Sequence, residues 1–124
     1  MILLTIDEIT KLHTKLTVKT GGSDGLRDLG LLESAVYSAQ TSFGGAEVYP
    51  TLAEKAARLQ FALTANHPFV DGNKRIGVLV MLLTLRLNGV MLHYTQAELT
   101  ELGLSAASGR ANYEDILAWI QAHI

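Results

Sequence analysis

The sequence contains no cysteine, which removes three kinds of chemistry at once: disulfide bonds, thiolate nucleophiles and zinc sites with cysteine ligands. It also lacks an excess of one charge. Ten basic and twelve acidic side chains give a formal net charge of −2, and both signs are scattered along the chain. A basic surface that could neutralise many phosphates is therefore not expected, and direct binding to nucleic acid is disfavoured.

A membrane-spanning segment and an export signal are not expected either. The most apolar stretch, residues 76–85, is about ten residues long, whereas a membrane helix needs about twenty. The first residues, MILLTIDE, carry no basic group ahead of the apolar ones, unlike a secretory signal peptide. We expect a cytoplasmic protein that does not enter a membrane.

Helix signals dominate what is present. Hydrophobic residues make up 48% of the 124 residues and charged residues 18%, so the chain can bury a core of its own. Three capping boxes, in which a threonine is followed three residues later by a glutamate, predict helix starts at Thr5, Thr51 and Thr95. Asp28 and Asn112 can cap two further helices.

The interruptions between these helices define the fold. Glycine-rich stretches at residues 21–25 and 44–45, and Pro68, break the helical pattern. Extended structure is expected only as short pieces, including a pair of strands near a glycine loop. The helix that begins near residue 72 or 73 is apolar on every face until Asn88-Gly89, so it should be buried. The sequence thus predicts one all-α domain, residues 1–124, bundled around this central helix.

The segment just before the central helix, HPFVDGNKR, combines residues that share a chemical use. His67, where one helix ends, can act as a general base near neutral pH. Asp71 is a hard oxygen ligand, suited to a Mg²⁺ ion that also binds phosphates. Gly72 allows a tight turn and a close approach of the backbone to a ligand.

The first turn of the central helix adds Asn73, Lys74 and Arg75. Free N–H groups and the helix dipole favour an anion there. Lys74 supplies a point charge, and Arg75 can hold two phosphate oxygens at once. A single histidine after a helix or a single Asp-Gly-Asn turn is more often structural. A base, a metal-type carboxylate, a glycine turn and two cations at one helix start indicate a catalytic site.

This segment closely resembles the signature of the Fic/Doc family, His-Pro-Phe-x-Asp/Glu-Gly-Asn-Gly/Lys-Arg. The chain length and the long apolar helix after the motif fit as well, so the resemblance covers the whole domain. It implies a Fic-type helical bundle. It also implies one of two reactions with ATP: transfer of AMP to a protein hydroxyl, as in Fic proteins, or transfer of the terminal phosphate, as in Doc toxins.

Two positions favour the Doc branch. Where AMP-transferring members have glycine this chain has Lys74, and where they have a second arginine it has Val78. The resemblance therefore implies that ATP binds in the reversed orientation, with its γ-phosphate at the helix start. Ala65 departs from the best-known Doc pattern, which has a basic residue there, so one phosphate contact is missing or comes from elsewhere.

The Doc resemblance implies a mechanism and partners. His67 would accept the proton of the target hydroxyl, Asp71 would hold Mg²⁺, and Gly72 to Arg75 would bind the phosphates. The target implied is elongation factor Tu, modified on a threonine so that protein synthesis stops. Self-restrained Fic proteins carry the string Ser/Thr-x-x-x-Glu-Gly/Asn, which is absent here. Restraint is therefore expected from a separate antitoxin protein.

Several alternatives remain open from the sequence. The loop of Gly22, Ser23, Asp24 and Gly25 resembles the flap on which Fic-type enzymes dock their target, or it is a plain helix connection. Structural or solvent roles are expected for the other three histidines, since no pair has zinc-site spacing. An AMP transferase and a non-catalytic binding module on the same fold are the two competing functions.

Overall fold

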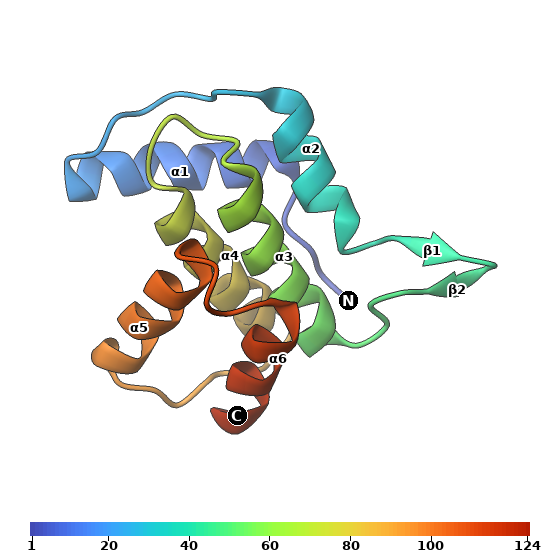
Figure 1. The fold of residues 1–124 in the computed structure, drawn as a ribbon. Coiled ribbons are helices and arrows are strands. Elements are labelled where there is room, and N and C mark those ends of the chain that lie inside the picture. The colour runs from blue at the N-terminus through green and yellow to red at the C-terminus, as the bar shows by residue number, and fades with distance from the viewer.

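The computed structural model describes residues 1–124 and contains six helices and one small hairpin (Figure 1). In chain order the elements are α1 (Ile6–Thr20), α2 (Leu29–Ser38), β1 (Ser42–Phe43), β2 (Ala46–Glu47), α3 (Leu52–Asn66), α4 (Asn73–Leu87), α5 (Gln96–Ala107) and α6 (Tyr113–Ala122). The prediction of an all-α fold is confirmed. The strands form an antiparallel pair on either side of Gly44-Gly45. None of the helices is long and apolar enough to cross a membrane.

The predicted caps form in the structure. Thr5, Thr51 and Thr95 each accept a hydrogen bond from the backbone N–H three residues on, and the glutamate there accepts one in return. Asn112 makes a fourth capping box with an aspartate, and Asp28 caps α2 with its side chain alone. These local bonds explain why the helix starts could be located from the sequence.

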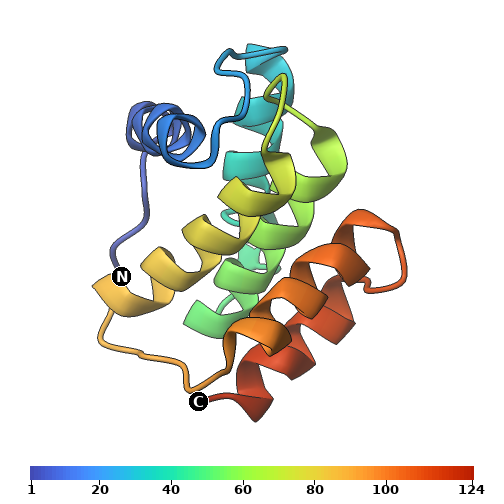
Figure 2. The ribbon, with the colours of Figure 1, turned by 90° about the vertical axis from the view of Figure 1, so that its left-hand side faces the viewer.

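Helices α3 and α4 lie side by side in the centre, with α1 and α2 on one side and α5 and α6 on the other (Figure 2). Close packing of α3 on α4 depends on Gly77, because a Cβ there would lie 2.8 Å from the Thr64 hydroxyl and 3.1 Å from the Gln60 carbonyl. The centre of the bundle is thus shared between α3 and α4. One face of α4, with Val78 and Leu82, is only partly buried.

The C-terminus is fastened to α5 through His123. One ring nitrogen, Nε2, lies 2.8 Å from the Glu98 carboxylate, and the other, Nδ1, lies 2.6 Å from the Trp119 carbonyl oxygen. Because both partners are acceptors, the protonated ring is the form that bonds to both. The bond to Glu98 raises the pKa of His123. The same bond lowers the pKa of Glu98 from 4.5 to about 2.

These pKa shifts predict how stability depends on pH. The raised pKa of His123 adds stability that is fully present below about pH 6.5, the unfolded value, and is lost as the pH rises through the folded value. The lowered pKa of Glu98 adds stability above about pH 4.5 that is lost towards pH 2. His123→Gln should therefore lower the midpoint of thermal unfolding more at about pH 5.5 than at about pH 9.

The exposed His93 provides the control. His93→Gln removes an imidazole that has no carboxylate partner, so its effect on thermal unfolding should be the same at both pH values. An equal loss at both pH values for His123→Gln would show that the ring acts only by packing on Trp119, whose ring centroid lies 4.0 Å from its own.

Candidate active site

The motif loop starts with an unusual backbone conformation at His67. This residue ends α3 with φ 49° and ψ 55°, and it is the only non-glycine residue with a positive φ. Such a left-handed conformation costs about 1–2 kcal/mol for a residue with a side chain. Its effect is to end α3 abruptly and to turn the exposed His67 side chain out at the helix end, where it can meet a substrate.

Arg27 holds this turn from outside the motif. Its Nε donates to the His67 carbonyl at 2.7 Å, and its Nη2 donates to the Asn66 carbonyl at 3.0 Å. The backbone N–H groups of Arg27 and Asp28 both donate to the Pro68 carbonyl. A guanidinium thus binds the free carbonyls at the C-terminus of α3, where the helix dipole favours a cation.

Asn73 closes the motif loop. Its buried side chain accepts a hydrogen bond from the Phe69 N–H at 2.9 Å and donates one to the Phe69 carbonyl at 3.0 Å. The amide nitrogen also lies 3.5 Å from Nδ1 of His67. We predicted that Asn73 binds phosphate. Because its side chain is engaged by the loop, its backbone N–H is the group that remains for that role.

The start of α4 differs from every other helix start in the chain. The other five helices are capped by a side chain, but the residue at the cap position of α4 is Gly72, with φ 79°, and this helix has no side-chain cap. The backbone N–H groups of Asn73, Lys74 and Arg75 donate no hydrogen bond. The side chains of Lys74 and Arg75 take part in no ion pair. Free N–H groups and two unpaired cations make this a site for an anion.

Asp71 presents an exposed carboxylate beside this helix start. Oδ1 accepts a hydrogen bond from the Gly72 N–H at 2.8 Å, and Oδ2 accepts a long one, 3.3 Å, from the Ser23 N–H. The chain offers no group of three or more acidic or histidine side chains that could hold a metal alone. A single carboxylate next to an anion site fits Mg²⁺, which takes its other ligands from phosphates and water.

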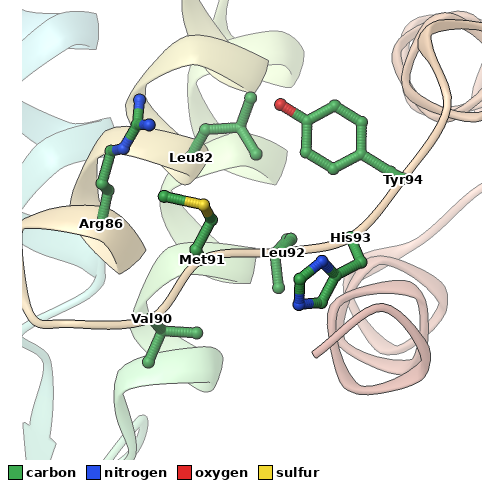
Figure 3. Close-up of a pocket in the computed structure, with 7 residues that line it drawn as sticks. All are labelled: Leu82, Arg86, Val90, Met91, Leu92, His93 and Tyr94. Atoms are coloured by element: carbon green, nitrogen blue, oxygen red, sulfur yellow. The ribbon is translucent and has the colours of Figure 1, made fainter.

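The motif residues surround a cleft of about 310 Å³, lined by His67, Val70, Asp71, Gly72, Asn73, Lys74 and Arg75. Lys74 and Arg75 also line a groove of about 470 Å³ between α4 and α5. The structure therefore brings the predicted base, the predicted metal ligand and the predicted phosphate-binding residues to one cleft. A third hollow, at the other end of α4, is shown in Figure 3. There Arg86 and His93 lie on different sides and no carboxylate joins them, so it lacks the convergent groups of the motif cleft.

The loop Gly22–Gly25, predicted to be a docking flap, lies directly against the motif loop. Leu26 and Phe69 form an antiparallel bridge, and the Val70 N–H donates to the Gly25 carbonyl at 3.0 Å. A Cβ on Gly22 would lie 3.0 Å from Oδ2 of Asp71, so glycine permits this close approach. A segment bound along this loop would thus lie beside the cleft.

Besides Arg27, the structure adds a second residue to the site that could not be read from the sequence. His13, on α1, is buried, and its Nε2 lies 2.6 Å from the Asp71 carbonyl oxygen. Its ring stacks on Phe69, with centroids 3.8 Å apart and planes 8° from parallel. The signal available in the sequence was its position four residues after Ile9, on the buried face of the helix.

Comparison with known proteins agrees with this geometry. The model of the Fic/DOC family matches residues 3–85. "Toxin Doc" of Mycolicibacterium smegmatis is 42% identical over 76 residues, which cover 61% of this chain and 58% of that toxin. "Protein kinase doc" of Escherichia phage P1 is 31% identical over 110 residues, which cover 89% of this chain and 86% of that kinase.

The family match includes the whole motif loop, Arg27, His13 and most of α4. The longer of the two alignments extends over most of the chain. Because the family match covers more than half of the chain, the chain belongs to the Fic/DOC family.

Proposed function

We propose that the chain is a Doc-like toxin that transfers the γ-phosphate of ATP to a hydroxyl group of a bacterial protein. Two relatives carry the names toxin and protein kinase, which supports the toxin and the kinase class. The observation that carries the proposal is how Lys74 and Val78 pack against α5. This packing affects which phosphate of ATP can lie at the start of α4.

Lys74 and Val78 form part of one wall of the α4–α5 groove. The methylene groups of Lys74 lie along Gly103 of α5, where a Cβ would be 3.3 Å from Cγ of Lys74. The same Cβ on Gly103 would lie 3.5 Å from Cγ2 of Val78. An AMP transferase needs a cation near Val78 to hold the outer phosphates. With Val78 there, Lys74 and Arg75 at the helix start are the only cations that line the groove and the cleft. We place the terminal phosphate beside them, because it carries the most negative charge.

The reaction proposed is an in-line displacement at the γ-phosphorus. The target hydroxyl oxygen forms the new bond to phosphorus, the bond to the β,γ-bridging oxygen breaks, and ADP leaves. His67 takes the hydroxyl proton as general base. The N–H groups of Asn73, Lys74 and Arg75, with the side-chain charges of Lys74 and Arg75, stabilise charge on the transferred group. Mg²⁺ on Asp71 would supply further charge neutralisation.

We further propose elongation factor Tu as the target and the loop Gly22–Gly25 as its docking segment. The loop pairs with the motif loop through Leu26 and Phe69, so a target segment laid along it would present a hydroxyl near His67. Phosphorylation of this factor in the cytoplasm would stop translation. The chain lacks the self-inhibitory string of Fic proteins, so we assign its restraint to a separate antitoxin that covers the cleft.

The reaction class is tested by labelled transfer to purified elongation factor Tu with Mg²⁺. Label from γ-labelled ATP should enter the factor and label from α-labelled ATP should not. His67→Ala should lower the rate roughly a hundred- to ten-thousand-fold, because the proton then has no acceptor. Asp71→Ala should also abolish transfer. His93→Ala, which removes an exposed histidine outside the motif, is the matched control and should transfer at the wild-type rate.

Each other result has a definite meaning. Incorporation of the α-label alone would replace the kinase by an AMP transferase. Transfer of γ-label into other proteins of a bacterial extract, but not into elongation factor Tu, would support the proposed phosphate transfer and rule out elongation factor Tu as the target. No transfer of either label by a folded chain would favour the binding module.

The toxin assignment is tested by expression in bacteria. Induced expression of the wild-type chain should arrest growth within a few generations, and expression of His67→Ala to the same level should not. Co-expression of the protein encoded next to this gene should restore growth. Unimpaired growth with the folded wild-type chain and no partner would refute the assignment.

A further inference from the structure

His13 is a fully buried polar side chain of α1 that reaches the motif loop. It is 1% exposed, and its contacts come from both loops that border the cleft. Nε2 lies 2.6 Å from the Asp71 carbonyl oxygen, and Nδ1 lies 3.5 Å from Oδ1 of Asp24. Its two ring nitrogens thus lie next to the predicted metal ligand on one side and the predicted docking flap on the other.

The hydrogen bond to Asp71 has a fixed direction. A carbonyl oxygen only accepts, so Nε2 of His13 carries the proton and donates it. The stacked Phe69 ring, 3.8 Å away, fixes the plane in which the imidazole lies. The donor thus comes from α1, and the buried ring of Phe69 in the motif loop sets its orientation.

This bond controls more than one carbonyl group. The carbonyl of Asp71 and the N–H of Gly72 belong to one planar peptide unit, so holding the oxygen also orients the N–H. That N–H is the donor to Oδ1 of Asp71, at 2.8 Å. One carboxylate oxygen is thereby held towards the backbone, and the position of the other is set. Gly72, at the cap position of α4, belongs to the same unit, and a Cβ built on it would lie 3.5 Å from Nε2 of His13.

We propose that His13 is a positioning residue for the reaction. It holds the Asp71–Gly72 peptide plane so that the Asp71 carboxylate is presented to Mg²⁺ and the free N–H groups of α4 to the phosphates. The catalytic part of this statement rests on the proposed function. The geometric part, control of the peptide plane, stands on the contacts alone.

Two substitutions separate this role from packing. The side-chain nitrogen of glutamine reaches about as far as Nε2 of histidine, whereas that of asparagine reaches only as far as Nδ1. His13→Gln thus retains a donor for Asp71, and His13→Asn does not. Both variants lose the same stacking on Phe69. Thr17→Val, one turn further along α1, is the control: Thr17 is buried, but its hydroxyl bonds only to the Thr14 carbonyl.

Two readouts are measured on each variant. The first is the hydrogen-exchange rate of the Gly72 amide, followed by NMR without nucleotide or metal. The second is the Mg²⁺ concentration that gives half-maximal phosphate transfer. We expect His13→Asn to speed exchange and to raise the Mg²⁺ requirement about tenfold, the usual effect of losing a partner that orients a ligand. His13→Gln should lie close to wild type in both, and Thr17→Val should equal wild type.

Equal behaviour of His13→Gln and His13→Asn in both readouts would overturn the proposal and leave His13 a packing residue. If the asparagine variant fails to fold, His13→Phe takes its place, because it keeps a stacked ring and removes the donor. If the wild-type chain transfers no phosphate, the proposed function fails. The exchange rate of Gly72 then still decides whether His13 holds the peptide plane.

Discussion

Three backbone N–H groups at the start of α4 donate to no acceptor within the protein, although every other helix of the chain has its start capped by a side chain. Such groups need a partner, and water or an anion is the partner left to them. Most of the local structure around α4 is arranged so that this start stays open: Gly72 replaces a capping residue, and Lys74 and Arg75 form no ion pair with the rest of the chain.

An open helix start is useful only if the loop before it is rigid. Here the loop is held from three directions: by Arg27 at the end of α3, by the Asn73 side chain from within, and by His13 from α1. These contacts hold His67 in its left-handed backbone conformation. Such unfavourable conformations are common at functional sites, where the surrounding structure stabilises them. The core below supports them, because Phe69 is buried and α3 approaches α4 closely at Gly77.

The sequence predicted what local chemistry determines. The capping boxes located the starts of the helices, and the residue types of the motif identified the cleft, because both depend on neighbours a few residues away. The position of Gly72 before the central helix was also readable. What could not be predicted depends on the tertiary fold. His13 and Arg27 lie 58 and 40 residues before the residues whose backbone they hold.

The direction of the Asn73 side chain was also beyond the sequence, because an asparagine in a first helical turn can face either the ligand or the loop. In the structure its amide oxygen accepts from the Phe69 N–H and its amide nitrogen donates to the Phe69 carbonyl. The same limit applied to α4, which reads as apolar on every face. The face with Val78 and Leu82 borders a groove, because α5 packs against α4 at a distance set partly by Gly103 and leaves that face partly open.

We propose that the phosphates of ATP bind at the open start of α4. This can be examined by NMR titration of the labelled chain with ATP and Mg²⁺, following the backbone amides. The signals of the Asn73, Lys74 and Arg75 amides should then move most, and Arg75→Ala should weaken the binding measured from them. A titration that leaves these amides unchanged and moves those of residues 90–94, around the hollow at the other end of α4, would contradict it.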